Sequence, residues 1–120
     1  MSLLRTTLLS AVLLSAISCN LDGFPNKEDL VGTWVEAEPY SDVLTFRGNG
    51  SLIRTIDGVT DTIIYRTDGD RGVVIFTDPS NAGFGELEYP VLMLSEQKHM
   101  LLEGYRSTSS QSADGEFFRR

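Results

Sequence analysis

Apolar and polar residues alternate with a period of two along most of the chain after residue 30, and no stretch there keeps a helical period. The clearest case is residues 86–93, where Leu87, Tyr89, Val91 and Met93 share one side and mainly polar residues share the other. Such alternation is typical of a strand with one buried and one solvated face. The pattern therefore predicts an all-β protein.

Eight segments of this kind follow one another. They are Thr33–Ala37, Asp42–Arg47, Ser51–Ile56, Thr60–Arg66, Gly72–Thr77, Glu86–Leu94, His99–Arg106 and Gly115–Arg119. Asn49-Gly50 and Asp57-Gly58 in the connections favour tight hairpins, because both residue types tolerate positive φ. Short connections make successive strands neighbours, so we expect an eight-stranded antiparallel up-and-down barrel. One helical turn, with Asn26 as its cap, is expected before the first strand.

The first 18 residues have a different pattern, which is typical of a secretory signal. Arg5 is the only charged residue before Asp22, and residues 8–17 are nearly all apolar. A helix that spans a membrane needs about 20 apolar residues, and this run is shorter. A basic start, an apolar run of about 7–15 residues and small residues at its end mark a signal peptide. We expect residues 1–18 to be cleaved, residues 19–29 to form a leash and residues 30–120 to form the barrel.

The end of the apolar run, Ala16-Ile17-Ser18-Cys19, resembles the lipobox of bacterial lipoproteins. In that family small or apolar residues lead to an obligatory cysteine. The resemblance implies a diacylglycerol on the sulfur of Cys19, cleavage before it, and acylation of the new amine by a fatty acid such as palmitate. Two or three acyl chains anchor a protein stably, whereas one does so only marginally. It further implies a membrane-anchored protein of the bacterial cell envelope, with the outer membrane favoured over the inner. The alternative is a buried free cysteine.

The charge balance excludes some partners. The chain has 10 Lys and Arg against 17 Asp and Glu, a net charge of −7, and loss of Arg5 with the signal makes it more negative. Such an acidic surface argues against nucleic acid, whose phosphates it would repel. It also argues against a basic face that lies on a membrane. Cys19 is the only cysteine, so the barrel has no internal disulfide.

Four segments resemble the lipocalins and related bacterial lipoproteins. Leu30-Val31-Gly32-Thr33-Trp34 is similar to the Gly-x-Trp start of the family, and residues 44–50 are similar to its second strand and hairpin. Residues 65–76 resemble a middle hairpin, and residues 116–119 resemble a closing strand. The likeness spans nearly all of the chain after Cys19. It implies that Trp34 closes the barrel floor.

The resemblance also implies a partner for this tryptophan. In the family an arginine from the last strand lies over the ring, a role that would fall to Arg119 or Arg120 here. The sequence is much shorter than the secreted lipocalins, it has no cysteine pair for their disulfide, and no C-terminal helix is evident in it.

Large side chains on the apolar side of several strands are the candidate ligand-binding residues. They are Phe46, Tyr65, Phe76, Tyr89 and Met93. An eight-stranded barrel is just wide enough to be filled by its own side chains or to hold one small ligand. Two hypotheses follow. The barrel binds a small, largely apolar ligand that enters opposite Trp34, or it is packed and its outer surface binds another envelope protein, as an inhibitor or assembly module.

The sequence contains no recognisable catalytic or metal-binding constellation. His99 is the sole histidine and is expected at the surface, without an aimed partner. No pair of ligands has the spacing of a known metal motif, and Asp68-Gly69-Asp70 is better explained as a hairpin turn. We therefore expect neither enzyme activity nor a metal or cofactor.

Overall fold

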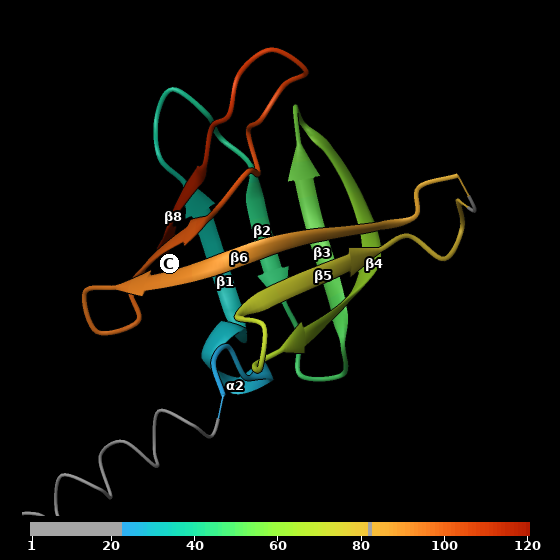
Figure 1. The fold of residues 1–120 in the computed structure, drawn as a ribbon. Coiled ribbons are helices and arrows are strands. Elements are labelled where there is room, and N and C mark those ends of the chain that lie inside the picture. Colours follow the sequence, from blue (N-terminus) through green and yellow to red (C-terminus); the bar gives the residue numbers. More distant parts are fainter. Residues whose placement is uncertain (1–22, 82) are drawn as a thin grey trace, which may run out of the picture.

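Eight antiparallel strands form a closed barrel in the part of the chain that the computed structural model describes, residues 23–81 and 83–120 (Figure 1). The strands are β1 (Gly32–Glu36), β2 (Val43–Phe46), β3 (Ser51–Ile56), β4 (Val59–Asp68), β5 (Val73–Thr77), β6 (Glu86–Leu94), β7 (His99–Leu102) and β8 (Gly115–Arg119). Each strand pairs with the next, and β8 closes onto β1 with Trp34 opposite Arg119. The prediction of an all-β, eight-stranded antiparallel up-and-down barrel is confirmed.

One predicted strand was too long. Residues 99–106 were expected to form a single strand, but β7 ends at Leu102. Beyond it the chain turns, because the amide of Tyr105 donates to the carbonyl of Leu102 and Gly104 takes a φ of 82°. This conformation is easiest for glycine. The turn directs the side chains of Tyr105 and Arg106 toward one end of the barrel.

The expected helical turn is α2 (Lys27–Leu30), which lies against one end of the barrel (Figure 1). The amide of Asn26 donates to the carboxylate of Asp29 at 2.8 Å, and the amide of Val31 donates to the carbonyl of Lys27. Leu30 is fully buried and joins the core. The indole Nε1 of Trp34 donates to the Leu30 carbonyl at 2.9 Å, so α2 is fixed to the first strand.

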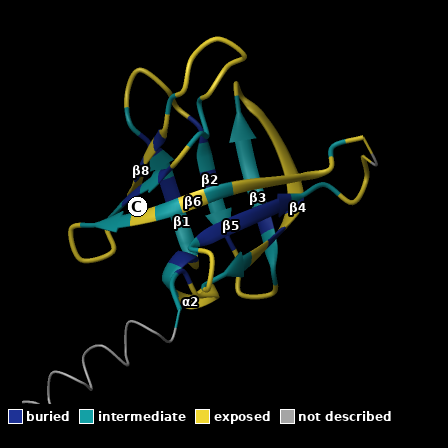
Figure 2. Ribbon diagram, viewed as in Figure 1, coloured by how far each residue is buried: buried dark blue, intermediate teal, exposed yellow. Residues whose placement is uncertain are grey.

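The barrel interior is filled by its own side chains, the larger of which are aromatic. Figure 2 shows where the buried residues lie along the strands. Neighbouring rings contact one another in a series that crosses the interior. The series is Tyr65, Phe46, Phe76, Tyr89, Tyr105 and Phe117, with successive ring centroids 4.9, 6.1, 5.3, 5.4 and 5.2 Å apart. Ring pairs at these distances and tilts are favourable beyond their burial. Aromatic rings therefore occupy much of the barrel body.

The up-and-down topology gives the barrel two unlike ends. The floor is the end that carries α2 and the connections at residues 47–50, 69–72 and 95–98. The mouth is the opposite end, formed by the connections at residues 37–42, 57–58, 78–85 and 103–114.

Candidate functional site

The floor is closed by Trp34 and Arg119. Trp34 is fully buried, and the guanidinium carbon of Arg119 lies 4.2 Å from its ring centroid. Arg119 also donates to the backbone carbonyls of Asp29, Val31 and Gln97 at 2.7–2.9 Å. These contacts tie α2 and the turn between β6 and β7 to the last strand. The choice between two arginines is thereby settled in favour of Arg119, since Arg120 is exposed at the end of the chain.

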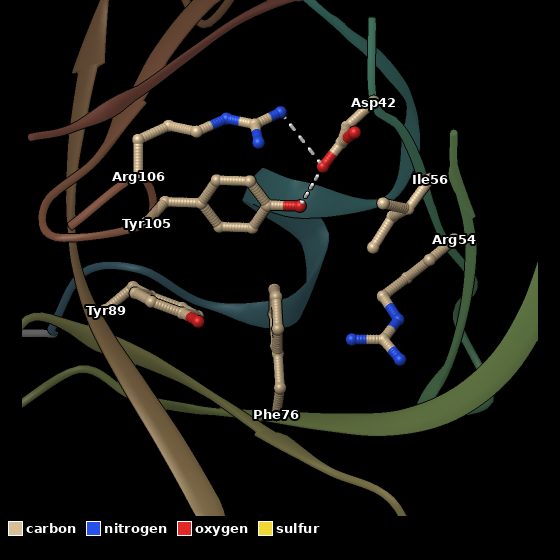
Figure 3. Close-up of a pocket in the computed structure, with 7 residues that line it drawn as sticks. All are labelled: Asp42, Arg54, Ile56, Phe76, Tyr89, Tyr105 and Arg106. Atoms are coloured by element: carbon tan, nitrogen blue, oxygen red, sulfur yellow. Dashed lines mark hydrogen bonds and ion pairs between the residues drawn. The ribbon is translucent and has the colours of Figure 1, made fainter. Parts of the chain in front are cut away.

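The mouth contains a pocket of about 220 Å³ (Figure 3). Its lining residues come from several strands and loops: Asp42, Arg54, Ile56, Phe76, Tyr89, Tyr105 and Arg106. Three aromatic rings and one isoleucine provide apolar walls, while two arginines and one aspartate provide charge. Mixed walls of this kind, apolar with a few placed polar groups, are typical of small-molecule sites.

A buried ion-pair network holds one side of this pocket. The Arg106 guanidinium binds both carboxylate oxygens of Glu36, with Nε donating to Oε2 at 2.8 Å. It also lies 3.2 Å from Oδ2 of Asp42. The side chains of Glu36 and Asp42 are 1% and 5% exposed. Their two negative charges therefore share one positive charge in a nearly dry environment, where an unpaired ion is costly.

Tyr105 completes the network. Its hydroxyl donates to Oδ2 of Asp42 at 2.7 Å, as Figure 3 shows. Burial, reinforced by this hydrogen bond and by the nearby carboxylates, raises the pKa of Tyr105 well above its ordinary value. The hydrogen bonds to Glu36 likewise raise the pKa of Arg106. Tyr105 is thus a neutral donor and Arg106 a fixed cation at neutral pH.

Arg54 reaches the pocket from β3, where it lies opposite Asp61 on the neighbouring strand β4. Its Nε and Nη2 atoms donate to the two carboxylate oxygens of Asp61 at 3.0 and 2.5 Å. This hydrogen bonding raises the pKa of Arg54 and lowers the pKa of Asp61. The arginine side chain is only 13% exposed, because it lies on the interior side of β3 together with Leu52 and Ile56.

The structure separates the predicted ligand-binding residues into two groups. Phe76 and Tyr89 line the mouth pocket. Phe46 and Tyr65 lie deeper and are almost completely buried among other side chains, with the Tyr65 hydroxyl donating to the Arg47 carbonyl at 2.7 Å. Met93 packs against the core and is not part of the pocket lining. Only two of the five residues are thus brought together at a cavity.

Sequence reasoning missed the charged residues of the pocket. The signal that could have found three of them is a charged residue on the apolar side of a strand. Glu36 comes two residues after Trp34, Asp42 two before Leu44, and Arg54 two after Leu52. A charge on the apolar side of a strand must be paired when it is buried. Tyr105 and Arg106 carried no such signal, because their strand was expected to continue through them.

His99 lies on the outer wall of the barrel and not at the pocket. Its ring stacks on Phe118 with centroids 4.4 Å apart and planes 12° from parallel. Its Nε2 atom is 3.6 Å from the carboxylate of Glu116, and its side chain is 21% exposed. The structure thus gives it no contact with the groups that line the mouth.

Within residues 23–81 and 83–120, no three His, Cys, Asp or Glu side chains are arranged to hold a metal ion. None of the helices described there is long and apolar enough to cross a membrane. Cys19, the predicted lipidation site, and the predicted signal at residues 1–18 lie outside the described residues.

Comparison with known proteins gives no relative: no protein-family model, no curated protein and no solved structure matches the chain. The class of the molecule therefore rests on its own geometry, which is a closed eight-stranded antiparallel barrel with a sealed floor and a pocket at its mouth.

Proposed function

We propose that this protein is a lipid-anchored, lipocalin-like protein of the bacterial cell envelope that binds a small molecule in the mouth pocket. The observation that carries the proposal is the pocket itself: a cavity of about 220 Å³ walled by the rings of Phe76, Tyr89 and Tyr105, with charged groups at fixed positions. The sealed floor supports a single entrance at the mouth, because Trp34 and Arg119 close the other end.

The size of the cavity limits the ligand. Sites for drug-sized molecules have volumes of about 300–1,000 Å³, and the mouth pocket is smaller. The barrel body below it is occupied by Phe46, Tyr65 and Phe117, all nearly or fully buried. A long acyl chain therefore has no space along the barrel axis. The ligand we propose is compact and amphipathic, with an apolar part against the aromatic walls and a polar part toward the charged groups.

The lipid anchor is supported by the lipobox-like residues 16–19 and tested at Cys19. Metabolic labelling with fatty acid should mark the full-length protein and leave Cys19→Ala unlabelled and released from membranes. Label on the Cys19→Ala protein, or an unlabelled wild-type protein found in the soluble fraction, would contradict the anchor. Fractionation of inner and outer membranes tests the expected placement in the outer membrane.

Ligand binding is tested by filling the pocket. The core cluster lies wholly within residues 30–117, so a chain of residues 20–120 keeps all of it. Native mass spectrometry after gentle purification should detect a small molecule on the wild-type chain. Ile56→Trp places a large ring in the pocket and should remove that molecule. Ile64→Trp is the matched control, because Ile64 is 47% exposed on the neighbouring strand and does not line the pocket.

A captured ligand should also stabilise the fold. At a concentration of 100 times its Kd, it should add about 2.7 kcal/mol to the free energy of unfolding of the wild-type chain. The same concentration of ligand should leave the free energy of unfolding of Ile56→Trp unchanged. Equal binding by the wild-type chain and by Ile56→Trp would place the site elsewhere and contradict the proposal.

A second candidate function is a packed barrel that binds another envelope protein through its outer wall. The filled interior favours it, as do large apolar side chains on the outside: Leu92 is 47% and Phe118 is 44% exposed. Contiguous exposed apolar surface is a mark of interaction sites. Loss of all small-molecule binding, with retention of a partner that Phe118→Ser releases, would favour this function over the first.

A further inference from the structure

Two hydrogen-bond donors at the pocket have no partner among the described residues. Asp61 occupies Nε and Nη2 of Arg54, whereas Nη1 makes no hydrogen bond. Figure 3 shows this guanidinium pointing into the space beside Phe76. The hydroxyl of Tyr89 likewise makes no hydrogen bond to a described residue, and Figure 3 shows it pointing toward Phe76. A ligand that fills the pocket must offer an acceptor to these atoms, because burying a donor without a partner is unfavourable.

The two arginines that line the pocket are already paired with carboxylates. Arg54 is neutralised by Asp61, and Arg106 is neutralised by Glu36 with Asp42 at its other side. No cation is left over to compensate a buried anionic ligand. Desolvation of such a ligand would therefore be uncompensated.

The rim of the mouth adds a negative field. The four connections at residues 37–42, 57–58, 78–85 and 103–114 carry acidic residues but only one basic residue, Arg106. The acidic residues are Glu38, Asp42, Asp57, Asp78, Glu103 and Asp114. A field of one sign at a cleft repels ligands of the same sign. It attracts cations, but a cation inside the pocket would face the unoccupied edge of the Arg54 guanidinium. Both kinds of ion are thereby disfavoured at the same place.

The volume and the walls define the rest of the ligand. A cavity of about 150 Å³ lined by apolar side chains accepts benzene. The mouth pocket, at about 220 Å³, has space for one such ring and a short substituent. Phe76, Tyr89 and Tyr105 offer ring faces and edges for aromatic packing.

We propose that the mouth pocket takes an uncharged molecule built on a single aromatic ring that carries a carbonyl-type acceptor. The acceptor binds Nη1 of Arg54 and the hydroxyl of Tyr89, and the ring packs against Phe76 and Tyr105. This inference rests on the proposed function, since it names the ligand class of the same pocket.

Four compounds of matched size separate charge from hydrogen bonding. Benzamide is neutral with a carbonyl acceptor, benzoate is an anion, benzylamine is a cation and toluene has no acceptor. Each is titrated into the ¹⁵N-labelled chain of residues 20–120 while the backbone amide resonances are followed by NMR. Benzamide should shift amides of residues 54–58 and 103–106, with a Kd at least tenfold lower than that of the other three compounds.

Two variants test the assigned contacts. Arg54→Met keeps the length of the side chain but removes the donors, and should raise the Kd of benzamide about tenfold while changing that of toluene less than twofold. Tyr89→Phe keeps the ring and should raise the Kd of benzamide severalfold. Arg66→Met is the matched control. Arg66 on β4 also forms an ion pair, with Glu86 on β6, but its side chain is 55% exposed and does not line the pocket.

The outcomes are distinguishable from those of the proposed function. Benzoate or benzylamine bound at the mouth as tightly as benzamide overturns the ligand class, and the binding function stands. Unchanged benzamide affinity in both Arg54→Met and Tyr89→Phe overturns the assigned contacts. Absence of binding by all four compounds also overturns the inference, and the proposed function is then decided by whether Ile56→Trp removes the captured molecule. Should Arg54→Met fail to fold, Tyr89→Phe alone decides the contact.

Discussion

Each end of the barrel places an arginine against an aromatic ring, but the two arginines donate their hydrogen bonds to different kinds of acceptor. At the floor, the Arg119 guanidinium covers Trp34 and gives its hydrogen bonds to three backbone carbonyls. At the mouth, Arg106 lies 4.0 Å from the ring of Tyr40 and gives its hydrogen bonds to carboxylates.

The difference follows from what surrounds each arginine. The floor carbonyls belong to α2 and a turn, so Arg119 joins separate segments and seals the barrel. The mouth carboxylates of Glu36 and Asp42 are themselves buried, so Arg106 compensates charges that the pocket wall contains. Arg54, also at the mouth, keeps one nitrogen without a partner among the described residues. The floor therefore serves stability, while the mouth retains groups that can contact a ligand.

The largest expected loss of stability comes from removing the ring of Trp34 at the floor. Trp34→Ala removes a fully buried ring and its hydrogen bond to the Leu30 carbonyl. It should lower the free energy of unfolding by about 3–5 kcal/mol in urea denaturation. Tyr40→Ala is the matched change at the mouth, where the ring is 47% exposed beneath Arg106. It should cost about 1 kcal/mol or less. Similar losses for the two variants would contradict the contrast between the ends.

The second prediction compares the two arginines directly. Arg106→Met leaves the buried carboxylates of Glu36 and Asp42 without a cation and should cost about 3 kcal/mol. Arg119→Met should cost less, about 1–2 kcal/mol, because Val31 and Gln97 are exposed and their carbonyls can bind water instead.

A double variant sharpens this comparison. Glu36→Gln combined with Arg106→Met removes one charge of each sign and should recover part of the loss seen with Arg106→Met alone. Thermal and urea unfolding of all three variants are the measurements. A larger cost for Arg119→Met than for Arg106→Met, or no recovery in the double variant, would show that charge compensation is not the role of Arg106.

The last prediction concerns pH. The pKa of Tyr105 is raised in the folded protein, by burial first and by Asp42 second, so its proton is held more tightly there than in the unfolded chain. Its stabilising contribution is present below the unfolded pKa of about 10 and is lost as pH rises above it, by about 1.4 kcal/mol per pH unit. Burial also raises the pKa of Tyr65 and Tyr89, so the wild-type protein should lose stability more steeply than one residue explains.

Tyr105→Phe isolates the contribution of this residue. Urea unfolding at pH 9, 10, 11 and 12 should give a shallower fall for Tyr105→Phe than for the wild-type protein, by about 1.4 kcal/mol per pH unit above pH 10. Curves that run parallel over this range would show that Tyr105 ionises as easily in the barrel as in the unfolded chain.

Much of the fold was predictable because strand signals are local. Alternation and turn residues placed all eight strands, and the bounds of Ser51–Ile56, Glu86–Leu94 and Gly115–Arg119 agree with the structure. The end of β7 was not predictable, because Tyr105 and Arg106 follow a strand without a strong breaker other than Gly104. Their conformation is set by the loop at residues 103–114, where the amide of Arg106 donates to the carbonyl of Ala113.

The candidate site was predictable only in part. Phe76 and Tyr89 were placed on the interior side by alternation and do line the pocket, whereas Phe46 and Tyr65 share the same alternation and are buried below it. Alternation gives the side of a strand but not the depth along the barrel axis. Depth depends on the stagger between neighbouring strands, which pairs Tyr65 with Phe76 and Phe76 with Leu87.

The sequence by itself determined the all-β class and the order of the strands, because both follow from short-range patterns of polarity and turns. The position of Trp34 at the barrel floor was predicted from the resemblance to the lipocalins. Only the tertiary structure decided that Arg119 covers Trp34, that aromatic rings fill the barrel body and that Asp42, Arg54 and Arg106 meet at one pocket. These residues come from different strands and loops. Their meeting depends on closure of β8 onto β1 and on the register of every pair between them, which no local pattern specifies.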